Sequence, residues 1–126
     1  MALPPRRKPK RSGIKRATDR VFPAHRAWVR RHGCSIVGCQ DGPIEFAHLR
    51  TSANSGAGLK PSDLNGISLC QGHHRRAHNI GHDSMARENG MTLDQLHKIA
   101  FEFARRSPDK KLRETFRLLF VSTELR

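Results

Sequence analysis

Residues 65–78 read NGISLCQGHHRRAH, and their pattern is the most informative in the chain. The apolar first half of this stretch predicts a short strand that runs directly into Cys70, and the second half predicts a helix. Cys70 and His73 have the spacing of a zinc knuckle. His74 and His78 are four residues apart, so a helix places them on one face. The stretch therefore predicts a strand–helix unit that carries two separate sets of metal ligands.

A second cysteine pair lies upstream, at Cys34 and Cys39. Structural zinc usually takes four cysteine or histidine ligands from two short knuckles, although two intervening residues are commoner than four. An odd number of cysteines argues against a disulfide framework. The alternative is three unrelated buried cysteines. We expect a structural zinc site, which would stabilise a small, loop-rich domain. Its ligands are Cys34, Cys39, Cys70 and His73.

His48 ends a segment, residues 44–49, whose alternating pattern predicts another strand. The order strand, loop, strand, helix can bring His48 opposite the His74 and His78 pair. Imidazole is a suitable general base near neutral pH, and a divalent metal beyond it would stabilise charge on a phosphate. Taken singly, His48 is as well explained as a core or capping residue, and an isolated histidine pair as a surface pair.

The flanking segments predict helices. Residues 22–32 form the first, with Arg26 pointing outward and Trp28 in the core or, alternatively, stacking on a base. A capping box at residues 92–95 begins a second helix. The last begins at Ser107 and Pro108. Its expected apolar face comprises Leu112, Phe116, Leu119 and Phe120.

A chain of 126 residues suits one domain. Residues 1–20, rich in Lys, Arg and Pro, predict a disordered basic arm. Residues 21–126 predict a single domain, with its motif core over 34–82 and C-terminal helices over 92–126. No apolar run is long enough for a membrane span, and the first residues lack a secretory signal, so we expect a cytoplasmic protein without a membrane partner.

The charge is strongly positive: 24 Lys and Arg against 11 Asp and Glu give a net charge of +13. Such an excess favours a polyanionic partner, of which nucleic acid is the usual example. A ribosomal-type or merely soluble basic protein is the alternative, and any single charge can be a solvated one. The cations expected to contact phosphate are Arg6, Arg7 and Lys8 in the arm, and Arg50, Lys60, Arg75 and Arg76 around the histidines.

Joined in order, three motifs resemble a known family: AHLR at 47–50, GAGLKPSD at 56–63 and LCQGHHRRAHNIG at 69–81. They look like the HNH, or ββα-metal, endonucleases with a treble zinc knuckle. Among these, the phage and prophage nucleases of the Ref-like and YbcO-like kinds are the most similar. The resemblance covers roughly residues 30 to 105. It implies an α+β fold, in which a small ββα-metal motif with a structural zinc knuckle packs against flanking helices.

The resemblance also implies roles for single residues. His48 matches the general base, and Asn65 the residue that orients it. His74 and His78 match ligands of a catalytic divalent metal, which would be Mg, Mn or Zn. The zinc ligands of the family correspond to Cys34, Cys39, Cys70 and His73.

One position departs from the family pattern. Many HNH enzymes place a metal-binding Asp or His just before the base, where this chain has Ala47. The metal would then hold more water, bind weakly, or borrow another ligand such as Asp63 or His82. Asp63 has a second possible role, holding His48, and residues 60–63 can also be a plain turn.

The sequence thus favours a DNA endonuclease of low sequence specificity, derived from a phage or prophage and linked to recombination. A Ref-like resemblance implies a recombinase filament as a further partner. The alternative is a non-catalytic zinc module that binds DNA or docks on such a filament. An RNA-directed protein is a third possibility, because phosphate chemistry is alike on both polymers.

Overall fold

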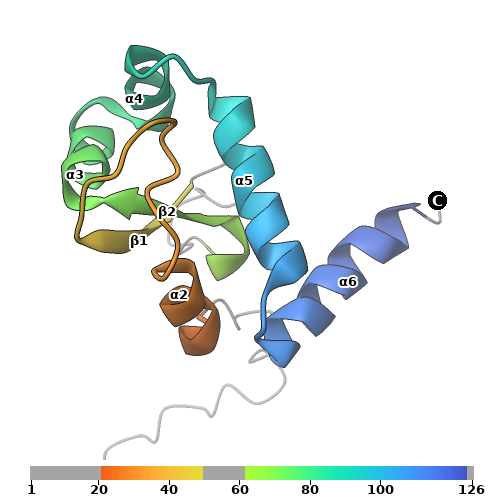
Figure 1. The fold of residues 1–126 in the computed structure, drawn as a ribbon. Helices are drawn as coiled ribbons and strands as arrows, with labels where there is room; N and C mark the ends of the chain where they lie inside the picture. The colour runs from red at the N-terminus through yellow and green to blue at the C-terminus, as the bar shows by residue number, and fades with distance from the viewer. Residues whose placement is uncertain (1–20, 50–61, 125–126) are drawn as a thin grey trace, which may run out of the picture.

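The computed structural model describes residues 21–49 and 62–124, with side chains as far as Leu119. This part mixes α-helices with one small antiparallel sheet (Figure 1), as the sequence predicted at that level. The predicted arm, with Arg6, Arg7 and Lys8, lies outside the described residues, as do Arg50 and Lys60. The elements are α2 (Pro23–Val29), β1 (Ile44–His48), the 3-10 turn η1 (Asp63–Asn65), β2 (Gly66–Cys70), α3 (Gln71–Ile80), α4 (His82–Glu88), α5 (Leu93–Arg106) and α6 (Lys110–Glu124).

The sheet is an antiparallel pair in which Ile44 lies opposite Cys70 and His48 opposite Gly66. Gly66 is required by its neighbour: a Cβ atom there would lie 1.9 Å from Cζ of Phe46. The Phe46 ring therefore lies over the Gly66 backbone and meets the His48 ring edge to face, with centroids 5.1 Å apart. This packing fixes one side of His48.

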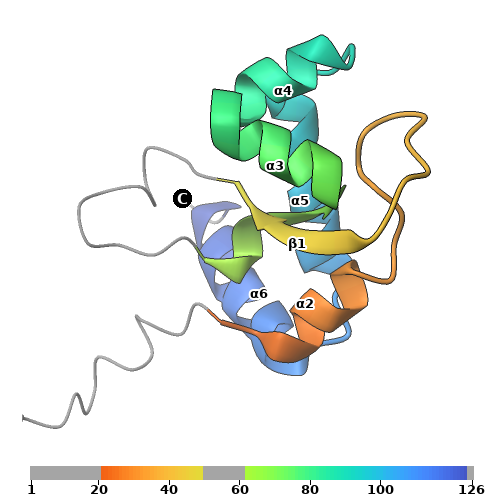
Figure 2. The same ribbon diagram turned by 90° about the vertical axis from the view of Figure 1, so that its left-hand side faces the viewer.

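The main core lies between the sheet and the helices α3, α4 and α5. Figure 2 shows α3 and α4 on one side of the sheet and α2 on the other. The side chains that share this core include Ala47, Ile67 and Leu69 of the sheet with Ala77, Met85, Leu96 and Ala100 of the helices. Burial of this apolar surface holds α3 against the strand that carries His48.

One helix was not predicted, and the start of another is confirmed. The short helix α4 was not predicted; it follows α3 after Gly81, whose φ of +89° turns the chain, and it buries Met85 and Ala86. The capping box of α5 is confirmed, since Thr92 Oγ1 accepts from the Gln95 amide and the Gln95 side chain accepts from Thr92.

The predicted start of the last helix was wrong. Ser107 ends α5, and α6 starts at Lys110, with Asp109 Oδ1 accepting from the Leu112 amide in the manner of an N-cap. Leu112 packs with Phe22 and Ala104 in a second, smaller core. Beyond it α6 extends away from the sheet (Figure 1). Of the expected apolar face, Leu112 is buried, Phe116 is half-buried and Leu119 is 53% exposed, while the side chain of Phe120 lies outside the described part.

Trp28 lies at the surface end of α2 instead of in the core. It is half-buried and meets His32 and Phe103 edge to face, with ring centroids 4.7 and 5.7 Å away. Lys98 and Arg106 complete a hollow of about 390 Å³ around these rings. No helix in the described ranges combines the length and apolarity that a bilayer crossing requires.

Candidate metal centres and the histidine site

Three cysteines and one histidine converge where the loop after α2 meets the start of α3. The ligand atoms of Cys34, Cys39, Cys70 and His73 all lie within 4.8 Å of one another. Cys39 Sγ is 3.8 Å from Cys70 Sγ, and Cys70 Sγ is 3.1 Å from His73 Nδ1. Sulfur atoms on a tetrahedral zinc, with bonds of about 2.3 Å, lie about 3.8 Å apart. The predicted grouping is confirmed, and these residues could bind a metal such as zinc.

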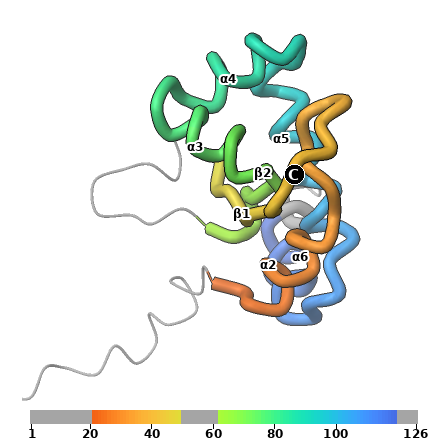
Figure 3. Tube along the Cα trace, turned by 60° about the vertical axis from the view of Figure 1, so that its left-hand side comes forward, coloured from red at the N-terminus to blue at the C-terminus, as the bar shows by residue number. Residues whose placement is uncertain are grey.

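Local structure brings the two pairs together. Between Cys34 and Cys39 the loop turns at Gly38, which has a φ of +78°, while Ile36 anchors it in the core. This long loop joins α2 to β1 (Figure 3). The Ser35 amide donates to the Ser68 carbonyl at 2.8 Å, which ties the loop to β2 beside Cys70. Cys70 is also the N-cap of α3, so the knuckle fixes the first turn of that helix.

The protonation state of the cysteine cluster depends on whether a cation is bound. Burial raises the pKa of the Cys34 thiol to about 11, so the free thiol is protonated at neutral pH. A bound divalent cation stabilises the thiolate and reverses that preference. His73 directs Nδ1 toward the sulfurs while its Nε2 lies 3.3 Å from Asn89 Oδ1. Asn89 follows α4, and its side-chain amide donates to the Met85 carbonyl. This support for His73 was missed at the sequence level, because nothing local in the sequence marks it.

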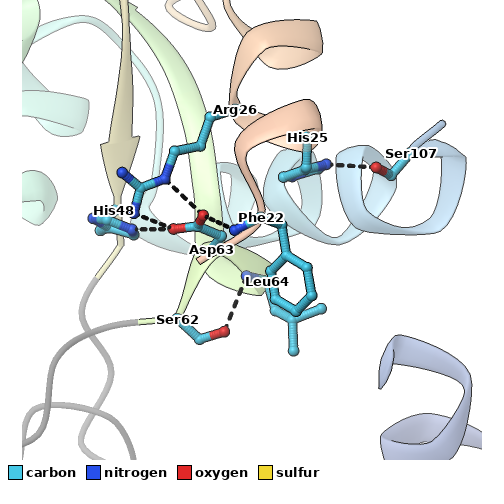
Figure 4. A network of polar contacts seen from close by, with 8 residues as sticks. All are labelled: Phe22, His25, Arg26, His48, Ser62, Asp63, Leu64 and Ser107. Atoms are coloured by element: carbon cyan, nitrogen blue, oxygen red, sulfur yellow. Dashed lines mark hydrogen bonds and ion pairs between the residues drawn. The ribbon is translucent and has the colours of Figure 1, made fainter. Parts of the chain in front are cut away.

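His48 is held by a buried carboxylate. Its Nε2 lies 2.7 Å from Asp63 Oδ1, and Asp63 is fully buried (Figure 4). The same carboxylate accepts from both Nε and Nη2 of Arg26, at 2.6 and 2.8 Å, and from the Phe22 amide at 2.7 Å. Burial alone would raise the pKa of Asp63, but the hydrogen bonds from His48, Arg26 and Phe22 outweigh it and lower the pKa. Asp63 is therefore an anion at neutral pH.

An anionic Asp63 decides which nitrogen of His48 is free. A carboxylate only accepts hydrogen bonds, so the His48 ring donates through Nε2. In the neutral ring the lone pair then sits on Nδ1. The His48 side chain is 26% exposed and lines a hollow, so a bound molecule can reach the ring.

These contacts correct the prediction for Arg26 and decide between the alternatives for Asp63. Arg26 was expected to point outward, but it lies against Asp63, because η1 passes beneath the start of α2. Of the two roles considered for Asp63, holding His48 is the one observed; its oxygens are occupied by four donors and are not free for a metal. Asn65, expected to orient the base, contributes its carbonyl to the amide of Leu49, next to His48, at 2.7 Å.

The paired histidines of α3 lie on the other side of the same hollow. His74 and His78 have ring centroids 4.8 Å apart, and both line a hollow of about 730 Å³ together with His48 and His82. His73 and His74 are neighbours in sequence but face different sites, as helix geometry predicts. His74 Nδ1 lies 2.8 Å from Oε1 of Glu45, a residue that the sequence reasoning did not single out.

The two arginines of α3 differ in their surroundings. Arg75 is exposed and lines a smaller hollow with Glu45, His74 and His78. Arg76 is also exposed, but its guanidinium donates two hydrogen bonds to the Glu88 carboxylate, at 3.1 and 2.6 Å. Arg75 is thus better placed than Arg76 to meet a phosphate at the histidines.

Comparison of the chain with protein-family models, curated proteins and solved structures gives no match.

Proposed function

We propose that this protein is a metal-dependent DNA endonuclease of the HNH type, which hydrolyses phosphodiester bonds with little sequence preference. The observation that carries the proposal is the placement of His48. It is bound to a buried carboxylate on one side and shares a hollow with His74 and His78 on the other. A hydrogen-bonded acid–histidine pair facing two potential metal ligands is an arrangement suited to activating water.

In the proposed reaction, Nδ1 of His48 accepts a proton from the water that attacks phosphorus. The new P–O bond forms as the bond to the leaving sugar oxygen breaks, and that oxygen is then protonated by solvent. Asp63 stabilises the imidazolium that results, as a buried anion 2.7 Å from Nε2. The Arg26 guanidinium keeps this carboxylate oriented toward His48.

The donor set facing His48 fits a divalent metal. Two imidazoles with a carboxylate close by can hold Mn²⁺, Zn²⁺ or Mg²⁺. When bound, such a cation supplies charge stabilisation for the phosphate and the leaving oxygen. A zinc ion at Cys34, Cys39, Cys70 and His73 would have a different task. It would fix the start of α3 and thereby the direction of His74 and His78.

Charge accounts for the choice of a nucleic-acid substrate. The net charge of +13 favours phosphate backbones, and Arg75 is exposed beside the histidine pair. Contacts to phosphate position a protein on DNA without reading its sequence. We therefore propose low sequence specificity and, following the Ref-like resemblance, a phage-derived role linked to recombination.

One observation favours a second candidate, a non-catalytic zinc module that binds DNA or docks on a recombinase filament. Ala47, where many HNH enzymes have a metal ligand, is fully buried and offers no donor atom. A module of this kind would bind DNA and leave it intact under every metal.

The test is cleavage of a supercoiled plasmid by protein carrying one equivalent of zinc, with and without added Mg²⁺ or Mn²⁺. We expect cutting by wild type and by His32→Ala, an exposed histidine outside the hollow. Cutting by His48→Ala or His74→Ala should fall by about 10²-fold or more. Undiminished cutting by His48→Ala would contradict the base assignment. Binding of DNA without cutting by wild type, alone and with a recombinase filament, would favour the second candidate.

A further inference from the structure

The buried Ala47 leaves the proposed catalytic metal site one ligand short on β1. Side chains two residues apart on a strand share a face, so Glu45 emerges on the same side of β1 as Ala47. On that face Ala47 belongs to the same core as Ala77 of α3. The Glu45 carboxylate therefore points from β1 toward α3, where its Oε1 contacts Nδ1 of His74.

We propose that Glu45 is a ligand of this divalent cation, together with His74 and His78, and replaces the donor absent at Ala47. The inference rests on the proposed function, since it completes the same metal site. It assigns to Glu45 a direct bond to the metal through its carboxylate.

The spacing of the two donor atoms supports a shared cation. Adjacent ligands of an octahedral ion with bonds of about 2.1 Å lie about 3.0 Å apart. Oε1 of Glu45 and Nδ1 of His74 are 2.8 Å apart. A cation can take the place of the proton between them if the neutral His74 ring carries its proton on Nε2. The distance between Glu45 Oε1 and His74 Nδ1 then has to increase only slightly, from 2.8 Å to about 3.0 Å.

His78 is the third donor because of its position on α3. It follows His74 by one helical turn, and both line one hollow with Glu45. Its side chain is exposed, so rotating it toward a shared cation meets little steric resistance. The three donors would bind one face of the ion and leave the other positions to water and phosphate.

Charge and hardness explain why a carboxylate matters here. Two neutral imidazoles do not offset the charge of a divalent cation, whereas Glu45 contributes a negative charge and a hard oxygen. Mg²⁺ and Mn²⁺ prefer such oxygen ligands. Asp63 cannot supply them, because its oxygens already accept from Arg26, His48 and Phe22.

The experiment measures binding of Mn²⁺ directly, by the electron paramagnetic resonance signal of the free ion. Protein carrying one equivalent of zinc is titrated with Mn²⁺, and wild type is compared with Glu45→Gln and Asp83→Asn. Asp83 is the matched control, since its carboxylate lines the larger hollow but pairs with Arg87. We expect the dissociation constant to rise at least tenfold in Glu45→Gln and to change less than twofold in Asp83→Asn.

The Gln variant also separates a ligand from a mere hydrogen-bond partner. Its amide oxygen can still accept a hydrogen bond from His74 Nδ1, but it lacks the charge that binds a cation. Wild-type Mn²⁺ affinity in Glu45→Gln would therefore overturn the inference, as would an equal loss in Asp83→Asn. Zinc content and circular dichroism, measured on each variant, report whether it is folded.

Failure of the inference is distinguishable from failure of the proposed function. If wild type cuts plasmid and Glu45→Gln binds Mn²⁺ as wild type does, Glu45 is not a ligand, but the proposed nuclease activity is supported. If Mn²⁺ binding depends on Glu45 but wild type cuts no DNA, the metal site is supported and the proposed nuclease activity is wrong. If zinc-loaded wild type binds no Mn²⁺, both the metal site and the proposed nuclease activity are wrong.

Discussion

Asp63 joins His48 to the first helix: its Oδ1 lies 2.7 Å from His48 Nε2, while the same carboxylate accepts from Arg26 and from the Phe22 amide. The candidate base, the turn before β2 and the start of α2 are thus held by one buried anion. A single group here serves both the chemistry of His48 and the attachment of α2.

Replacing Asp63 by Asn should therefore lower both the rate of cleavage and the stability of the fold. Asn cannot stabilise an imidazolium, and its amide can donate to the His48 ring, which would place the lone pair on the wrong nitrogen. We expect cleavage to fall by about 10²- to 10⁴-fold. The urea midpoint should also fall, since Arg26 loses its charged partner. An Asp63→Asn protein that cuts at the wild-type rate would refute the role given to Asp63.

Asn89 should tune the affinity of the Cys3His cluster for zinc. Its Oδ1 lies 3.3 Å from Nε2 of His73 and favours the tautomer that leaves Nδ1 free for a metal. We expect Asn89→Ala to weaken zinc binding by about 10- to 100-fold, measured by competition with a chromophoric chelator. Asn79→Ala, at an exposed position of α3, is the control and should bind as wild type does. Equal affinities in the two variants would show that Asn89 does not support His73.

Acid should destabilise the protein through His25. This side chain is fully buried, with Nδ1 2.7 Å from Ser107 Oγ (Figure 4). Burial lowers the pKa of His25 from 6.5 to about 4, against the opposing effect of the carboxylates of Asp63 and Asp109. The unfolded chain therefore binds a proton that the folded chain refuses. The contribution of His25 is intact above pH 6.5 and is lost as the pH falls from 6.5 toward 4.

Urea titrations between pH 4 and pH 6.5 test whether acid lowers the stability through His25. The wild-type midpoint should drop more steeply with falling pH than that of His25→Gln, which has no group to protonate at this position. Acid also releases zinc, but that loss is common to both proteins and cancels in the difference. Parallel curves for the two proteins would contradict the assignment.

The two arginines of α3 should contribute unequally to DNA affinity. Arg75 is exposed beside the histidine pair, whereas Arg76 is bound to Glu88 through two hydrogen bonds. In a plot of log affinity against log salt concentration the slope is negative, and Arg75→Ala should reduce its magnitude by about 1. Arg76→Ala should change it less, because its charge is already partly neutralised. Fluorescence anisotropy with a labelled duplex at several salt concentrations measures both. A larger effect for Arg76 would show that DNA follows another path.

How much the sequence predicted depends on how local each feature is. Cys34 and Cys39, and likewise Cys70 and His73, are close in sequence, so their spacing alone predicted the cluster. The strand pair and the capping box were found for the same reason. The separate directions of His73 and His74 followed from helix geometry.

Two side-chain pairings between distant segments were not predicted. The pairing of Arg26 with Asp63 spans 37 residues, and that of Glu45 with His74 spans 29. Each depends on how α2 and α3 pack against the sheet, which no local pattern encodes. Trp28 was assigned to the core because it shares part of one helix face with Phe22 and Val29, whereas its position near the end of α2 leaves it half-buried. The short α4 was missed because its core contacts, at Met85 and Ala86, involve few residues.

The most direct test of the central claim compares wild type with His48→Ala on one DNA substrate, measuring binding and cutting in the same samples with Mn²⁺. We expect equal affinity for the duplex, because His48 is not assigned to phosphate binding, and a loss of cutting of about 10²-fold or more. Equal cutting by the two proteins, or no cutting by a wild type that binds both Mn²⁺ and DNA, would contradict that claim.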